Sequence, residues 1–514
     1  MQNPSENTKR IAKNTIMLYI RMLFSMLVSL YTSRITLAAL GVEDYGIYNI
    51  VGGFMAMFSL ISTSLSSSVS RFLTVELGRG NKENLKSVFS TSLSIQVALA
   101  AIVFIVAESF GTWFLNTHMT IPEERLYAAN WVFQASIISF LFGLFSVPFN
   151  ASIIAHEHMS AFAYIGILDV ILKFAAVCFV AYAPCPFDKL IIYAILLLLI
   201  GIGLQLIYII YCRRHFEECR LKFSFERNYW KEMSSFAGWN FIGCTAGLLK
   251  DQGVNLLFNI FFGPILNAAR GLASTVNNVI AAFANNFMTA LNPQLTKSYA
   301  AGDKEYCFSL VNRGSRFSFY IMMFFAIPLI LETDFALNLW LEEFPEHTVN
   351  FVRLVLVLSM SDIISNTLIH LQLATGKIRD YQIVVGGILL LNFPLSYIAL
   401  QLGASPEVTY IIAIAISLFC MIMRLVFLRK MAGISMKRFM TKVYFNILIV
   451  SISAFIIPFL IHISMDEGWT RFLVVGFTSV ITSGLSICFI GCTHNERAFL
   501  FLKTKDVLHK IFKR

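Results

Sequence analysis

The residues of this chain that could do chemistry are charged side chains inside long apolar segments. Asp169 and Lys173 are four residues apart, so on a helix they share a face and can neutralise each other. Structural pairing is one interpretation of these two, and a substrate or coupling role is the other. Lys250 and Asp251 lie in the middle of another segment. The other charged residues inside or near the ends of apolar segments are Arg21, Arg34, Arg270, Asp362 and Arg424.

These charges leave the apolar segments net positive, with six cationic against three anionic side chains. An ionisable group at bilayer depth is costly, so each is a candidate for function. A cationic lumen favours an anionic substrate, because guanidinium and ammonium groups can replace water around a phosphate. Near the end of a segment, a long cationic side chain can instead reach the membrane surface. The residues expected to line a central substrate cavity are Arg21, Arg34, Lys250, Asp251 and Asp362.

One segment also carries regularly spaced amides. Asn278, Asn285 and Asn292 are seven residues apart, which places them on roughly one face of a helix. Amides on a lumen face could hydrogen-bond the hydroxyl groups of a sugar. The alternative is that they bond neighbouring helices, as polar side chains do in membrane proteins.

The composition fixes the class of protein that must position these groups. The chain has 514 residues, of which 57% are hydrophobic and 14% charged, and its mean hydropathy is +0.70. Soluble domains carry about 25% charged residues. A soluble enzyme, a nucleic-acid binder and a fibrous protein are therefore excluded, and an all-α polytopic membrane protein is predicted.

About 20 apolar residues span a bilayer as a helix, and fourteen segments qualify. The basic residues are very unevenly distributed. When residues near the end of a segment are counted with the adjacent loop, 30 Lys and Arg fall on the side of the N-terminus and six on the other side, and four lie deeper within segments. Since basic loops stay in the cytoplasm, both termini are predicted to be cytoplasmic. The predicted spans are 16–40, 47–69, 88–107, 129–154, 161–182, 190–211, 236–262, 268–291, 311–331, 352–374, 381–402, 408–428, 443–463 and 472–492.

The two halves of the chain resemble each other at an offset of 222 residues. Gly80-Asn-Lys82-Glu83 aligns with Gly302-Asp-Lys304-Glu305, each after the second span of its half. Two pseudo-symmetric six-helix lobes are typical of transporters, with the site between them near the bilayer midplane. The predicted parts are an N-lobe (1–212), a cytoplasmic linker (213–235), a C-lobe (236–430), and two further helices with a basic cytoplasmic tail (431–514).

Three short segments resemble a known family. They are Ser33-Arg34-Ile-Thr-Leu-Ala-Ala-Leu40-Gly41-Val-Glu43-Asp44-Tyr45-Gly46-Ile-Tyr48, Lys9-Arg-Ile-Ala-Lys-Asn14-Thr, and Ala374-Thr-Gly-Lys377. With the helix count and the repeat, they resemble the Wzx-type polysaccharide flippases of the MOP superfamily, which also contains the MATE drug exporters and the lipid II flippase.

The resemblance implies a function in the bacterial cytoplasmic membrane. Such proteins move a polyprenyl-pyrophosphate-linked oligosaccharide, a unit of O-antigen, capsule or exopolysaccharide, to the outer leaflet through a cationic cavity. The lipid II flippase has an intramembrane arginine in its first helix, which implies a cavity role for Arg21. The expected partners are the lipid-linked anionic oligosaccharide, the bilayer and other polysaccharide-assembly membrane proteins, with no nucleic acid.

No bond changes in such a reaction, so the protein is predicted not to be an enzyme and to need no catalytic residue, metal or cofactor. The chain has no Walker motif, so coupling to a proton or sodium gradient is expected. One alternative is a MATE-type cation-coupled drug antiporter, although the first span lacks the acidic residue that such exporters use. A second alternative is a membrane polysaccharide polymerase or ligase, although no large outer loop is present.

Overall fold

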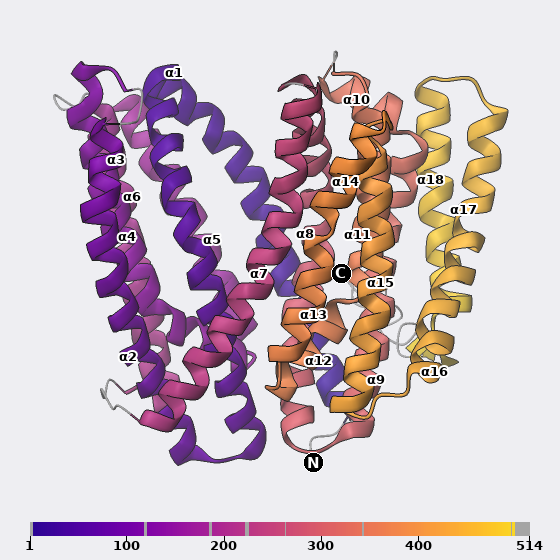
Figure 1. Cartoon of the computed structure of the whole chain (residues 1–514), viewed down its shortest axis with the longest axis horizontal. Helices are drawn as coiled ribbons and strands as arrows, with labels where there is room; N and C mark the ends of the chain where they lie inside the picture. Colours follow the sequence, from indigo (N-terminus) through magenta and orange to yellow (C-terminus); the bar gives the residue numbers. More distant parts are fainter. Residues whose placement is uncertain are drawn as a thin grey trace, which may run out of the picture. The chain divides into compact units, whose positions relative to one another are not determined.

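The computed structural model describes residues 4–117, 121–183, 188–220, 226–262, 264–341, 344–494 and 496–498. All regular structure in these ranges is helical (Figure 1), which confirms the predicted all-α fold. The α-helices are α1 (Pro4–Arg79), α2 (Lys82–Val106), α3 (Thr112–Thr117), α4 (Glu123–Ala155), α5 (Met159–Tyr182), α6 (Lys189–His215), α7 (Arg227–Phe262), α8 (Pro264–Ala300), α9 (Lys304–Leu331), α10 (Thr333–Leu341), α11 (Thr348–Ile364), α12 (Asn366–Thr375), α13 (Arg379–Leu390), α14 (Asn392–Gln401), α15 (Val408–Met431), α16 (Met436–Phe439), α17 (Asn446–Ser464) and α18 (Trp469–Ser486).

Eleven helices in the described part of the chain are long and apolar enough to cross a membrane. The three other predicted spans are helical as well and fall in the second part of α1, in α7 and in α8. α1 comprises two helices, because Gly41 at its bend has φ 82° and ψ 170°, a conformation that glycine adopts without penalty. The protein is therefore a polytopic membrane protein, and the structure agrees with about fourteen membrane helices.

The chain packs into two compact units. Unit 1 comprises Met1–Thr245 and Thr289–Asp303, and unit 2 comprises Ala246–Met288 and Lys304–Arg514. Both α7 and α8 therefore begin in one unit and end in the other. This division follows packing rather than the internal repeat, so the predicted lobe and linker boundaries stay a prediction.

The repeat is visible in one local structure. Gly80 and Gly302 both have positive φ, at 73° and 81°. The following N–H, of Asn81 or Asp303, donates to the carbonyl five residues earlier, at 3.3 and 3.1 Å. A left-handed glycine that satisfies the last carbonyls is a common helix end. Because the paired positions are 222 residues apart, both halves end their second helix with the same turn.

A charged cluster joins three helices of unit 1. The guanidinium of Arg125, on α4, contacts the carboxylates of Asp44, on α1, and Asp188, which precedes α6. Asp188 also caps α6 by accepting a hydrogen bond from the N–H of Leu190 at 2.9 Å. Such a cap satisfies a backbone donor that the first turn leaves open. The motif residue Asp44 thus has a structural partner.

The last two membrane helices, α17 and α18, are joined to α9 at both ends within unit 2. At one end the buried carboxylate of Glu332 accepts from His462 Nδ1 at 2.8 Å and lies 3.1 Å from Arg471 Nε. At the other end Arg316 contacts Glu496 at 2.9 Å. The two helices lie side by side in Figure 1, so this hairpin is tied to the core of unit 2.

Candidate functional site

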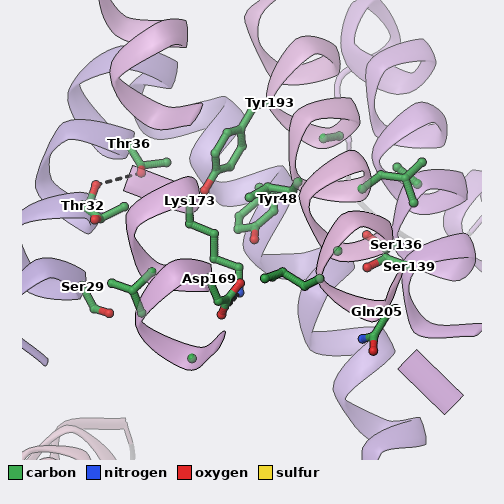
Figure 2. Close-up of a pocket in the computed structure, with 18 of the residues that line it drawn as sticks. Ser29, Thr32, Thr36, Tyr48, Ser136, Ser139, Asp169, Lys173, Tyr193 and Gln205 are labelled. Atoms are coloured by element: carbon green, nitrogen blue, oxygen red, sulfur yellow. Dashed lines mark hydrogen bonds and ion pairs between the residues drawn. The ribbon is translucent and has the colours of Figure 1, made fainter. Parts of the chain in front are cut away.

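Unit 1 contains a cavity of about 710 Å³, lined by α1, α4, α5 and α6. Its lining is mixed: hydroxyl and amide side chains alternate with apolar ones such as Leu197 and Leu198. Tyr48 and Tyr193 form an aromatic wall with ring centroids 5.3 Å apart. Figure 2 shows Thr32 and Thr36 on one side and Gln205 on the other, with Asp169 and Lys173 between them. The polar lining includes Ser29, Thr32, Thr36, Ser136, Ser139 and Gln205.

Three charged side chains line this cavity. Lys173 Nζ donates to Asp169 Oδ2 at 2.9 Å, along one face of α5. The third is Arg21, on α1, whose guanidinium carbon lies 4.5 Å from the centre of the Phe162 ring, a cation–π arrangement. With two cations and one carboxylate, the lining carries one net positive charge. The side chain of Arg34 lies outside the described part of the structure.

The position of Arg21 depends on a glycine of α5. A Cβ atom placed on Gly166 would lie 2.7 Å from Nε of Arg21 and 2.9 Å from its Cδ. Real Cβ contacts are not this short, so any side chain at position 166 would displace the arginine. The missing side chain of Gly166 therefore provides the space in which Arg21 lies against α5.

The other predicted charges lie in unit 2. Lys250 Nζ, on α7, is 3.6 Å from Asp362 Oδ2, on α11. The lysine side chain is 8% exposed and the aspartate 46%. Asp362 also accepts a hydrogen bond from the Ser417 hydroxyl, on α15, and Asn392 Nδ2 donates to the backbone carbonyl of Lys250 at 3.4 Å. Lys250 is therefore buried beside a counter-ion whose side chain is exposed.

Two helices near this pair continue through a single intervening residue. α11 is followed by α12 after Ser365, and α13 by α14 after Leu391. Both residues keep right-handed helical dihedral angles, with φ -79° and ψ -13° at Ser365 and φ -62° and ψ -16° at Leu391. The backbone beside Lys250 is therefore helical throughout.

Asp251 and the asparagines are arranged differently from the other candidates. The Asp251 side chain is exposed, and its backbone carbonyl accepts from Arg270 at 3.1 Å. Asn278 and Asn285 are exposed in unit 2, whereas Asn292 is half-buried in unit 1. The predicted role of these residues as lumen lining stays a prediction.

Comparison with known proteins supports the fold. No protein-family model matches the chain. An uncharacterized membrane protein, EpsK of Bacillus subtilis, is 22% identical over 329 residues, which are 62% of this chain and 63% of that protein. This chain thus matches less than two thirds of the relative's length. A MATE crystal structure in complex with MaD3S superposes with a TM-score of 0.72 at 14% identity, covering 83% of this chain and 97% of the other. This chain has the MATE transporter fold.

Two further structures with this fold are transporters of the MOP superfamily. One is an outward-facing multidrug resistance MATE transporter of the MOP superfamily, with a TM-score of 0.69 and 14% identity over 82% of this chain and 96% of the other. Another is a MOP transporter from Pyrococcus furiosus, whose reversed pocket polarity suggests a different function; its TM-score is 0.67 at 14% identity, over 82% and 95%. The MATE fold is therefore shared by proteins whose pockets differ in polarity.

Within this MATE-like fold, the charged residues of the cavity could be identified from the sequence, whereas most of its lining could not. Ser136 and Ser139 are three residues apart on α4, and Thr32 and Thr36 four apart on α1, so each pair shares a helix face. That spacing was the available signal. It is weak, because small hydroxyl residues also serve close packing between membrane helices.

Proposed function

We propose that this protein is a flippase that moves a polyprenyl-pyrophosphate-linked oligosaccharide across the bacterial cytoplasmic membrane by alternating access. In this proposal both termini are cytoplasmic and the prenyl chain stays in lipid. An ion gradient of protons or sodium drives the cycle. The protein makes and breaks no covalent bond.

The unit 1 cavity is the observation that supports the proposal most. Moving a pyrophosphate through hydrocarbon without a polar pathway carries a large desolvation cost. The cavity offers Arg21 and Lys173 against one carboxylate, Asp169. Its hydroxyl groups can donate to and accept from sugar hydroxyls, and Tyr48 and Tyr193 provide flat apolar surfaces. A polar ligand with net negative charge is therefore the best match.

The unit 2 pair supplies a third cation, Lys250, to the same proposal. Lys250 and Asp362 are 3.6 Å apart, longer than the 2.7–2.9 Å of a strong charge-assisted hydrogen bond. Because the side chain of Asp362 is exposed, a phosphate group could compete with this carboxylate for Lys250. In the proposal the pyrophosphate is bound in turn by Lys250, Arg21 and Arg34. Asp362 binds the coupling ion while Lys250 contacts the pyrophosphate.

A drug antiporter of the MATE type is the second candidate. It is favoured by the fold, because one of the similar structures is a multidrug resistance transporter. It is also favoured by Asp169, Asp251 and Asp362, carboxylates in predicted spans that could bind a cation. The excess of positive charge in the unit 1 cavity argues against a cationic substrate.

Deleting the gene in its native host tests the proposal. We expect lipid-linked oligosaccharide to accumulate in the cytoplasmic leaflet, where an impermeant glycosidase added to whole cells cannot reach it. Wild-type protein should restore access and Arg21→Ala at equal abundance should not. Unchanged lipid-linked sugars, together with greater sensitivity to a cationic dye such as ethidium, would favour the antiporter.

A further inference from the structure

The turn between α4 and α5 contains a strained glutamate. Glu157 has φ 62°, one of two non-glycine residues with positive φ in the described part of the chain. Glycine adopts this conformation without cost, whereas for other residues it is unfavourable by about 1 kcal/mol or more. A glutamate at this position therefore needs a compensating interaction from its side chain.

That interaction comes from the end of α8. The carboxylate of Glu157, 1% exposed, accepts from Gln294 Nε2 at 2.6 Å and from Lys297 Nζ at 2.7 Å. Arg10 on α1 lies 3.2 Å away. Hydrogen bonds to an ionised group are among the strongest in proteins. Glu157 thus joins the start of α1 and the end of α8 through one buried charge.

Two apolar contacts support the same segment. Ala290 of α8 packs with Leu18 and Met159 in one buried cluster. Further along, a Cβ atom on Gly78 would lie 3.1 Å from the Cβ of Ala300, so α1 and α8 approach closely only because position 78 is glycine. Positions 78 and 300 are equivalent in the 222-residue repeat, so the two symmetry-related helices meet at matching residues.

The path of α8 through both units determines what must happen to this contact during transport. α8 is one helix of 37 residues, and it starts in unit 2 and ends in unit 1 from Thr289 onward. Alternating access moves one lobe of a transporter against the other. The end of α8 must then either leave unit 1 or stay there while the helix bends at Pro293, where a backbone hydrogen bond is missing.

We propose that Glu157, with Gln294, Lys297 and Arg10, forms a releasable latch that holds the end of α8 in unit 1 and opens once in each transport cycle. The inference rests on the proposed transport function. Release is favoured over bending because the contact includes an ion pair with Arg10, whose side chain is 42% exposed. Water can replace such hydrogen bonds at moderate net cost.

Cysteine alkylation tests the latch without reference to any transported molecule. In a variant lacking the native cysteines, Ser298→Cys places a small probe at a buried position on the end of α8. Ser152→Cys, equally conservative and buried on α4 of unit 1, is the matched control. If the latch opens, a membrane-permeant maleimide should label position 298 about tenfold faster than position 152. Glu157→Gln should raise the rate at 298 by about tenfold and leave 152 unchanged.

Equal protection of positions 298 and 152, unaffected by Glu157→Gln, would overturn the latch even if the protein is a flippase. Faster labelling of both positions in Glu157→Gln would also overturn it, because Glu157 would then hold unit 1 together generally. A second variant, Gln294→Leu, removes another hydrogen bond to Glu157. It should raise the labelling rate at 298 and leave 152 unchanged, as Glu157→Gln does. An unchanged rate at 298 in both variants would overturn the latch.

Discussion

Arg21 occupies the space that a side chain on Gly166 would fill, with its Nε 2.7 Å from the position of the absent Cβ atom. The arginine comes from α1 and the glycine from α5, so the packing of these two helices fixes where the charge enters the unit 1 cavity. Sequence inspection identified the arginine but not the residue that positions it.

Gly166→Ala should therefore impair transport without removing any charge. The added methyl group must displace Arg21, and because it meets only the flexible side chain of the arginine, the fold can accommodate the change at little cost. We expect transport to fall by about tenfold at normal protein abundance. Gly203→Ala is the control, because nothing lies within 4 Å of a Cβ at that position of α6. Wild-type transport in Gly166→Ala would show that the position of Arg21 is unimportant.

Exchanging Asp169 and Lys173 distinguishes a structural role of this ion pair from a functional one. If the two residues only neutralise each other, Asp169→Lys with Lys173→Asp should keep most activity, because the 2.9 Å contact can form in either direction. Either residue changed alone to Ala should lower protein abundance on an immunoblot. Normal abundance with lost transport in Lys173→Ala would instead place Lys173 in contact with substrate.

Removing Lys250 and removing Asp362 should lower the unfolding stability of the protein by different amounts. Asp362→Asn leaves Lys250, 8% exposed, as an unpaired buried cation. Lys250→Met leaves a carboxylate that is 46% exposed and still bonded to Ser417. Removing one member of a buried pair is costly chiefly for a buried survivor. We expect Asp362→Asn to lower unfolding stability in detergent by about 2 kcal/mol more than Lys250→Met.

The double variant Lys250→Met with Asp362→Asn is the control for that comparison. It removes both charges, so its melting temperature should recover most of the loss seen in Asp362→Asn. A larger loss in Lys250→Met than in Asp362→Asn would show that the aspartate, not the lysine, depends on the pair.

Membrane orientation gives a prediction that involves no site residue. The excess of basic residues on one side predicts that reporter fusions at positions 82, 222, 304 and 436 lie in the cytoplasm. Fusions at 118, 187, 345 and 467 should lie outside. Paired alkaline phosphatase and fluorescent-protein fusions distinguish the two sides, and one reversed site between two correct ones would contradict the count of fourteen helices.

The helical architecture could be predicted because each element depends on local sequence. Long apolar runs specify the helices, and Gly80 and Gly302 specify the turns that end two of them. The contact of Lys173 with Asp169 was predictable for the same reason, since both lie on one turn of one helix.

Contacts between distant segments could not be predicted in this way. The pairing of Lys250 with Asp362 needs α7 and α11 to pack together, and no local pattern encodes that packing. Glu157 lies in a short turn next to two histidines and looks unremarkable in the sequence. Its importance comes from the end of α8, more than 130 residues later.

An assay of lipid flipping by the purified protein tests the proposed transport of a lipid-linked oligosaccharide. The protein is reconstituted into vesicles that contain a polyprenyl-pyrophosphate-linked oligosaccharide with a fluorescent label on the sugar, and an impermeant quencher reports the fraction on the outer leaflet. The proposed function predicts that wild-type protein exchanges the labelled lipid between leaflets and that Arg21→Ala does so about tenfold more slowly. No exchange by folded wild-type protein, in vesicles where the same preparation transports ethidium, would contradict it.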